Sequence, residues 1–180
     1  MSDDIKILKD VSNKLIENQI PFMVTGSMAM NFYIEPRMTR DIDIVVYLQQ
    51  EDITILEKIF SEVYYIDPDA IKLAIENNKM FNIIHNESII KIDFILRKKT
   101  AYRRLEFERR VKVVIEDFET FMVSKEDLIL SKLDWMKKSQ SEMQKRDLIN
   151  LLSSNFDKAY VNEYSKELGV YELLQELENG

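Results

Sequence analysis

Hydrophobic residues recur at three- and four-residue steps at the start of the chain and run continuously soon afterwards. The first pattern predicts an amphipathic helix over residues 3–18. The continuous run at 21–24 predicts a short buried strand that enters Gly26, and a short helix follows with Ser27 as its N-cap. The β-branched run at 41–48 then predicts a second strand.

The same two patterns alternate through the middle of the chain, and a purely helical pattern follows. Up to residue 123 the three- and four-residue spacing predicts helices at 51–62, 68–78 and 100–110. Over the same part of the chain the strand pattern predicts strands at 80–85, 88–96, 111–115 and 121–123, and the last of these is a short edge segment. From Ser124, which opens a capping box with Asp127, the helical spacing predicts helices at 124–138, 141–152, 157–167 and about 170–178.

This order of elements predicts an α+β (α/β) fold, a small mixed β-sheet flanked by helices with a C-terminal helical extension. We expect residues 1–123 to form the core and residues 124–180 to form a helical region docked on it. Docking is expected because no Pro- or Gly-rich linker separates the two parts.

Composition then narrows the class of protein. No apolar run approaches the roughly 20 residues that a membrane-spanning helix needs, and the charged first residues do not form a secretory signal. The absence of cysteine excludes disulfides and thiolate metal sites. We therefore expect a cytoplasmic protein without a membrane partner, and its oligomeric state stays open.

Three aspartates are the main candidates for chemistry. Asp41 and Asp43 share one face of a strand whose alternate residues are apolar, and Asp93 is the one acidic residue in a second apolar strand. If the two strands pair, the three carboxylates can meet. Two bare carboxylates repel each other, and a hard cation such as Mg²⁺ relieves that repulsion. The alternative is a set of aspartates that simply face water.

A glycine turn precedes the acidic pair. Gly26 is one of three glycines in the chain, and it lets the backbone approach a ligand closely. Ser27 adds a hydroxyl at the start of a helix, where backbone amides can bind an anion. The turn alone is weak evidence, but with the three carboxylates it indicates a site for a nucleoside triphosphate.

These residues resemble the DNA polymerase β-type nucleotidyltransferase superfamily. Its pattern is Gly-[Gly/Ser], a spacer, Asp-x-[Asp/Glu] and a later third carboxylate. In this chain the pattern falls on Gly26, Ser27, Asp41, Asp43 and Asp93. The resemblance implies a nucleotidyltransferase fold with NTP and Mg²⁺ as ligands, the metal in a two-ion site held by the three aspartates. It also implies that Asp93 activates the acceptor hydroxyl and that the Gly-Ser turn holds the β- and γ-phosphates.

The run from Arg37 to Asp43 further resembles the Arg-x-Thr-x-Asp-x-Asp form of small prokaryotic members, including the AbiEii-type toxins of toxin–antitoxin pairs. The helix at 124–133 and the later Arg146-Asp147 pair resemble their tail. That resemblance implies that Lys132 binds triphosphate.

Other charged residues near these motifs have less specific roles. Arg37 contacts a phosphate or braces its loop, and the sequence does not separate these roles. Asp127 and Asp147 are expected to be helix caps or salt-bridge partners of Lys132 and Arg146 rather than catalytic groups.

The function that these motifs favour is transfer of NMP from an NTP to a hydroxyl acceptor with release of pyrophosphate. Seven positive charges within residues 97–110 favour RNA or tRNA as the acceptor, although the net charge of −7 opposes this. A protein acceptor and a cognate antitoxin follow only from the toxin resemblance. The alternatives are an antibiotic-modifying nucleotidyltransferase, a catalytically silent nucleotide-binding or antitoxin-like module, and a helical interaction protein.

Overall fold

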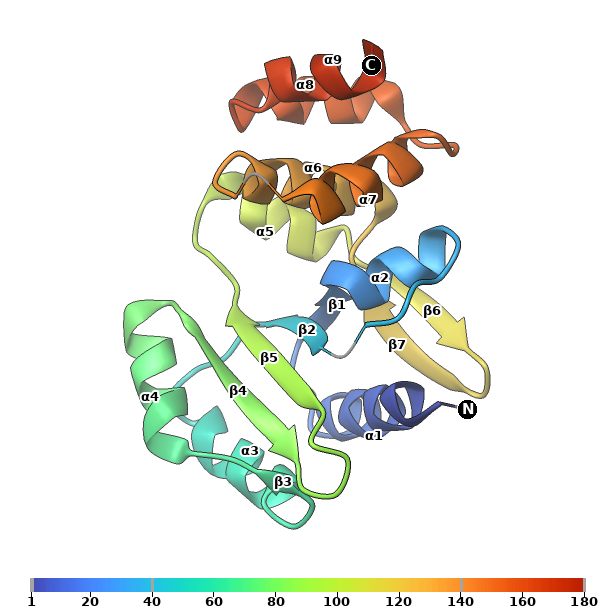
Figure 1. Cartoon of the computed structure of the whole chain (residues 1–180). Helices are drawn as coiled ribbons and strands as arrows, with labels where there is room; N and C mark the ends of the chain where they lie inside the picture. Colours follow the sequence, from blue (N-terminus) through green and yellow to red (C-terminus); the bar gives the residue numbers. More distant parts are fainter. Residues whose placement is uncertain (1, 40, 140, 180) are drawn as a thin grey trace. The chain divides into compact units, whose positions relative to one another are not determined.

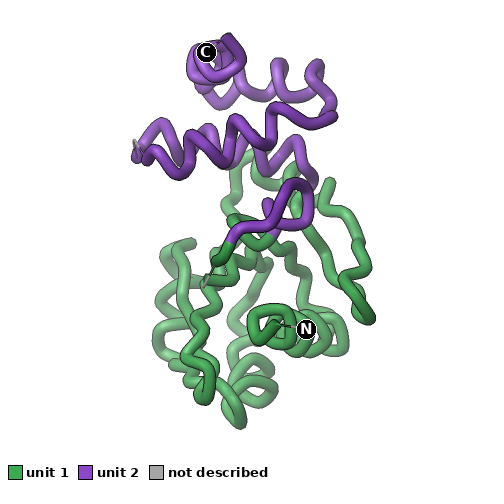
Figure 2. The backbone as a smooth tube through the Cα atoms, turned by 45° about the vertical axis from the view of Figure 1, so that its right-hand side comes forward, with its two compact units in different colours: residues 1–28, 38–123 green, residues 29–37, 124–180 purple. Residues whose placement is uncertain are grey.

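The computed structural model describes residues 2–39, 41–139 and 141–179 of the 180-residue chain. These residues form two compact units, drawn in green and purple in Figure 2. The first contains residues 1–28 and 38–123, and the second contains residues 29–37 and 124–180. The second unit thus takes in a segment near the N-terminus that the sequence pattern did not assign to it. The predicted division into domains at residues 123 and 124 stays a prediction.

The first unit is built on a mixed sheet whose strand order is β3-β4-β5-β2-β1-β7-β6 (Figure 1). The β2–β5 and β1–β7 pairs are parallel, and the other pairs are antiparallel. The strands are β1 (Phe22–Thr25), β2 (Asp41–Val46), β3 (Tyr64–Tyr65), β4 (Met80–His85), β5 (Lys91–Leu96), β6 (Val111–Ile115) and β7 (Phe118–Met122). The helices of this unit are α1 (Asp3–Glu17), α3 (Asp52–Phe60), α4 (Pro68–Asn77) and α5 (Ala101–Glu108).

Apolar stripes and local caps explain these elements. Leu8, Val11 and Leu15 recur on one face of α1 and are fully buried. On the same helix Ser12 shares a buried 2.9 Å hydrogen bond with Thr120 of β7, so α1 packs against that strand. The helices α4 and α5 begin at the expected caps, because the side chains of Asp67 and Thr100 accept hydrogen bonds from backbone amides of the first turn.

The central strand β2 is fully buried on one face only. Ile42, Ile44 and Val46 are fully buried on β2, while Asp41 is exposed and Asp43 is half-buried on the opposite face. This alternation confirms the predicted orientation of the strand. It leaves the acidic pair on the face that the core does not use.

Four details of the predicted elements were wrong. The helix α2 (Gly26–Tyr33) begins at Gly26, so Ser27 lies inside its first turn and is not the N-cap. The strand β7 is longer than predicted and lies between β1 and β6 rather than at an edge, because a turn with Glu116 at a φ of 50° folds it back onto β6. The short strand β3 was not predicted, and the β4–β5 turn spans more residues than Asn86-Glu87, with Ile89 at a φ of 57°.

The second unit consists mainly of the four predicted C-terminal helices. These are α6 (Lys125–Met136), α7 (Glu142–Leu152), α8 (Lys158–Glu167) and α9 (Tyr171–Asn179). The capping box at the start of α6 is confirmed, since Ser124 accepts a hydrogen bond from the Asp127 amide and donates one of 2.6 Å to its carboxylate. Among the described residues, no helix is long and apolar enough to cross a membrane.

Candidate functional site

The register of the sheet brings two of the predicted aspartates together. The strands β2 and β5 are neighbours in the sheet (Figure 1). They run parallel, and their register makes Asp43 the direct partner of Asp93. Asp41 lies opposite Lys91 in the same ladder. The pairing that would allow three carboxylates to meet is therefore present, although the two strands are separated by more than forty residues in the sequence.

The glycine turn lies directly against this acidic pair. Thr25 at the end of β1 is the register partner of Asp43, and Gly26 follows with a φ of 64°. A Cβ atom at residue 26 would overlap the Asp43 carboxylate and lie 2.9 Å from its Cγ. Only glycine combines this left-handed backbone with this approach. The unusual placement of glycine in the sequence thus has a structural reason at the candidate site.

A lysine that the sequence did not single out joins the carboxylates. The Nζ of Lys91 lies 2.9 Å from Oδ2 of Asp93. The hydrogen bond to Asp93 raises the pKa of Lys91, and the charges of Asp41 and Asp43 act in the same direction. The sequence could have identified Lys91 by its spacing from Asp93, because residues 91 and 93 lie on the same face of one strand.

Asp93 is nearly inaccessible and incompletely satisfied. Its exposed fraction is 7%, and Oδ1 has no hydrogen-bond partner among the residues that the structure describes. A buried carboxylate oxygen without a donor is costly. A cation or an acceptor hydroxyl could supply the missing interaction.

The three carboxylates are ligands of the kind that a hard divalent cation binds, but they do not form a preassembled metal site. Among the described residues, no group of three or more histidine, cysteine, aspartate or glutamate side chains is arranged to hold a metal ion. Carboxylate oxygens are nonetheless the ligands that Mg²⁺ prefers, and Asp93 Oδ1 is left without a donor in the described part of the chain. Asp41, Asp43 and Asp93 are therefore the residues that could hold Mg²⁺, with Lys91 as the present counterion of Asp93.

Arg37 and Lys132 belong to the second unit, where one carboxylate joins them. Arg37 donates two hydrogen bonds to Asp147, of 3.1 Å from Nε and 2.9 Å from Nη2. Lys132 is 6% exposed and donates to the same carboxylate at 3.0 Å and to Gln144 at 3.1 Å. Burial would raise the pKa of Asp147, but the hydrogen bonds from Arg37 and Lys132 outweigh it and lower that pKa.

The two acidic residues of the tail have the structural roles that the sequence favoured. Asp147 is a salt-bridge partner of Lys132, as expected, and its second partner is Arg37. Asp127 completes the capping box and accepts a 2.7 Å hydrogen bond from the Tyr160 hydroxyl. The contact of Arg37 with Asp147 was missed, since nothing local in the sequence relates residues so far apart.

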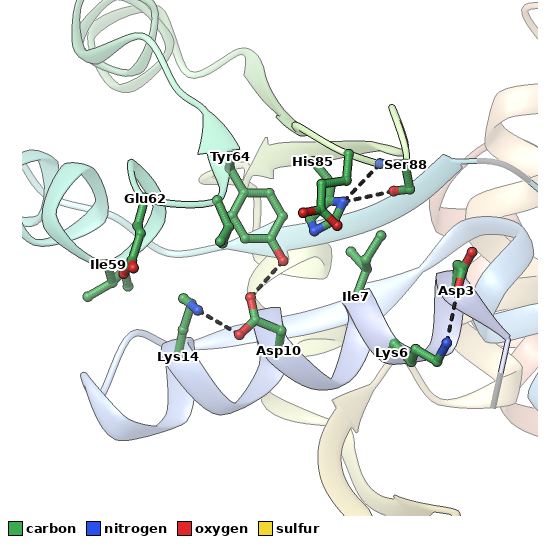
Figure 3. Close-up of a pocket in the computed structure, with 12 residues that line it drawn as sticks. Asp3, Lys6, Ile7, Asp10, Lys14, Ile59, Glu62, Tyr64, His85 and Ser88 are labelled. Atoms are coloured by element: carbon green, nitrogen blue, oxygen red, sulfur yellow. Dashed lines mark hydrogen bonds and ion pairs between the residues drawn. The ribbon is translucent and has the colours of Figure 1, made fainter.

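A pocket of about 660 Å³ lies in the first unit and contains none of the predicted site residues (Figure 3). The Asp10 carboxylate on α1 accepts hydrogen bonds from the Tyr64 hydroxyl at 2.7 Å and from Lys14 at 2.6 Å. His85, the single histidine of the chain, holds Ser88 of the following turn through Nδ1. The polar groups of Asp10, Lys14 and Tyr64 thus form hydrogen bonds with one another, and so do those of His85 and Ser88.

Structural comparison places the fold among nucleotidyltransferases. An antigenic nucleotidyltransferase-like protein from Paracoccidioides brasiliensis superimposes with a TM-score of 0.67 at 16% identity, covering 97% of this chain and 89% of that one. ANT(2")-Ia in complex with adenylyl-2"-tobramycin gives a TM-score of 0.63 at 12% identity, covering 93% and 97%. The lincosamide antibiotic adenylyltransferase LnuA, bound to lincomycin, gives 0.52 at 18% identity, covering 82% and 96%.

Sequence comparison adds no assignment. No protein-family model matches the chain, and no curated protein matches it by sequence. At the identities of the structural matches the likeness concerns the fold. The predicted mixed sheet with flanking and C-terminal helices is thereby confirmed as a nucleotidyltransferase-like fold. The relation to the AbiEii-type toxins stays a prediction.

Proposed function

We propose that this protein is a Mg²⁺-dependent nucleotidyltransferase that transfers NMP from an NTP to a hydroxyl acceptor and releases pyrophosphate. The observation that carries the proposal is the pairing of Asp43 with Asp93 on parallel strands, with the Gly26 turn packed against Asp43. An isolated acidic surface would not need a glycine at that point. The nucleotidyltransferase-like fold supports the same reaction class.

In this reaction the acceptor oxygen forms a bond to the α-phosphorus. The bond from that phosphorus to the bridging oxygen of the β-phosphate breaks, and pyrophosphate leaves with the electron pair. Asp93 takes the proton of the acceptor hydroxyl, a role that suits its unpartnered Oδ1 among the described residues. Lys91, whose Nζ lies 2.9 Å from Oδ2 of Asp93, is the counterion of this carboxylate before the acceptor arrives.

Asp41, Asp43 and Asp93 would hold Mg²⁺, in two ions on the superfamily pattern, which would neutralise charge on the phosphates. Gly26 and Ser27 would bind the β- and γ-phosphates through the backbone amides at the start of α2. The left-handed backbone of Gly26 supports this role, because it brings the turn close to the Asp43 carboxylate.

Arg37 and Lys132 would contribute differently to the nucleotide. The Arg37 side chain is 31% exposed while Asp147 holds its guanidinium, and we propose that Arg37 contacts a phosphate from this position. The Lys132 side chain is only 7% exposed and is committed to the same carboxylate. We therefore propose that Lys132 acts mainly by neutralising Asp147, which positions Arg37.

For the acceptor we propose RNA or tRNA first and a protein side chain second, with action as the toxin of a toxin–antitoxin pair as the biological setting. A small hydroxylated molecule is the competing acceptor, because ANT(2")-Ia binds adenylyl-2"-tobramycin and LnuA is a lincosamide antibiotic adenylyltransferase. A silent nucleotide-binding module remains the alternative to catalysis.

Radiolabelled NTPs with Mg²⁺ test the proposal, offered separately with total tRNA, cell lysate proteins, tobramycin and lincomycin. We expect label in one acceptor and an equal amount of pyrophosphate. Asp93→Asn should abolish both, because its amide cannot accept the proton. The matched control is Asp69→Asn, an exposed position on α4, which should leave turnover unchanged. ATP binding without pyrophosphate in any mixture would instead establish the silent module.

A further inference from the structure

Two arginines of the first unit share a single aromatic ring. Arg97 follows β5, and Arg110 precedes β6. Their guanidinium carbons lie 5.6 Å and 4.6 Å from the centroid of the Phe107 ring on α5. The sequence places these cations thirteen positions apart, and the fold of the intervening helix brings them to one place.

The charge of this arginine pair is not balanced by an ion pair within the described residues. There the buried Nε atoms of Arg97 and Arg110 both lack a hydrogen-bond acceptor. Burial lowers the pKa of Arg110, and the charge of Arg97 lowers it further. Two like charges with unused donors form a site that an anion would stabilise.

Arg97 of this pair lies on the same face of the sheet as the candidate catalytic carboxylates. Every second side chain of a strand points to the same face, so residues 93, 95 and 97 share one face at β5, and residues 43, 45 and 47 share that face at β2. The backbone amide of Arg97 still bonds to the carbonyl of Val46, which extends the ladder past the last strand residue. Asp93 and Arg97 are four positions apart in extended chain, a distance of about 13 Å.

An exposed tyrosine completes the arrangement. The Arg97 guanidinium lies 4.3 Å from the centroid of the Tyr47 ring, and that residue is 40% exposed. Lys98 and Lys99 beside it are exposed as well. Acidic peptides would need only the cations, whereas a base can also stack on an aromatic face. The combination of stacked arginines and a partly exposed ring favours nucleic acid.

We infer that Tyr47, Arg97 and Arg110 form a second binding site on this face, which takes a phosphate and an adjoining base of a single-stranded RNA acceptor. The inference rests on the proposed function and gives its proposed RNA acceptor a binding site. The carboxylate end of the face would handle the NTP, and the arginine end would hold the acceptor strand.

The test is fluorescence anisotropy with a fluorescein-labelled single-stranded RNA oligonucleotide over a range of salt concentrations. Arg97→Gln/Arg110→Gln should weaken binding by about tenfold or more. It should also reduce the slope of log K against log salt by about 0.7, because the variant no longer neutralises the one phosphate that the arginine pair binds. The control Lys98→Gln/Lys99→Gln removes the same charge from adjacent exposed positions and should weaken binding much less.

A second variant covers the case in which the arginine variant does not fold, since Arg110 also donates to the Phe107 carbonyl at 2.7 Å. Tyr47→Ala keeps both cations and removes the partly exposed ring, so RNA affinity should fall while the salt slope stays unchanged. Equal losses in the arginine and lysine variants, or RNA displacement by polyglutamate as effective as by unlabelled RNA, would overturn the inference.

Failure of this inference and failure of the proposed function give different results. If ATP with Mg²⁺ binds and pyrophosphate is released, but the arginine variant binds RNA normally, the proposed catalysis is supported and the proposed acceptor site is wrong. If RNA binding depends on the arginine pair and no NTP is consumed, the RNA-binding site is supported and the proposed catalysis is wrong.

Discussion

At the scale of single residues, the contact of Gly26 with Asp43 carries the most information. The glycine has both a left-handed backbone and a neighbouring carboxylate that leaves no room for a side chain. This contact fixes the turn to the acidic strand.

Gly26→Ala should therefore destabilise the protein more than a left-handed backbone alone explains. We expect a loss of at least about 2 kcal/mol in the free energy of unfolding from strain and overlap together. Urea denaturation measures it. The matched control is Gly169→Ala, since Gly169 has a φ of 66° but its added Cβ would meet only the flexible end of Lys137 at 3.3 Å. Equal losses in the two variants would show that the overlap with Asp43 does not matter.

The ion pair between Lys91 and Asp93 makes a second prediction about a single residue. Lys91→Gln leaves the buried carboxylate without a counterion, so stability should fall by about 1–3 kcal/mol without metal. Mg²⁺ should then raise the melting temperature of the variant more than that of the wild type, because it replaces the lost charge.

The control for that experiment is Lys112→Gln, which breaks an exposed pair with Glu119. Its stability should change by less than about 1 kcal/mol, and Mg²⁺ should have no added effect. If Mg²⁺ stabilises Lys91→Gln no better than this control, the carboxylates do not bind the metal.

At the scale of elements, the Asp147 carboxylate connects α7 to Lys132 of α6 and to Arg37. The pKa of Asp147 is lowered in the folded protein, so its contribution to stability is present above its unfolded pKa, about 3.9, and is lost as the pH falls through its folded value. Asp147→Asn should cost about 3 kcal/mol at neutral pH, because it leaves Lys132 buried without its charge partner.

The difference in unfolding free energy between wild type and Asp147→Asn should shrink as the pH falls below about 4. Chemical denaturation across that range measures the difference. Asp3→Asn, which breaks an exposed pair with Lys6, should be nearly neutral at every pH. A constant difference for Asp147→Asn would contradict the role given to its charge.

The elements also show how far the sequence could predict the structure. The shared face of Asp41 and Asp43 and the Ser124 cap follow from local spacing, and the structure has both. The ion pair of Arg37 with Asp147 and the inner position of β7 depend on partners far along the chain. Such contacts are set by tertiary packing, which a period of two or of 3.6 residues does not encode.

At the scale of the whole molecule, the net charge of −7 has a consequence for substrate binding. Three carboxylates and a triphosphate repel each other unless a cation lies between them. ATP should therefore raise the melting temperature only when Mg²⁺ is present, and EDTA should reverse the effect. Asp43→Asn/Asp93→Asn should remove the response. Stabilisation by ATP in EDTA would place the nucleotide away from the carboxylates.

The second unit also has an order of assembly built into its connectivity. Arg37 and its partner Asp147 are 110 residues apart in the sequence. At synthesis rates of about 5–20 residues per second, Arg37 leaves the ribosome roughly 5–20 s before its partner leaves it. During that interval the strands of the first unit can pair, while the segment at 29–37 still lacks its anchor. A nascent chain whose α7 had not yet emerged from the ribosome would thus carry a formed sheet and an unfinished second unit.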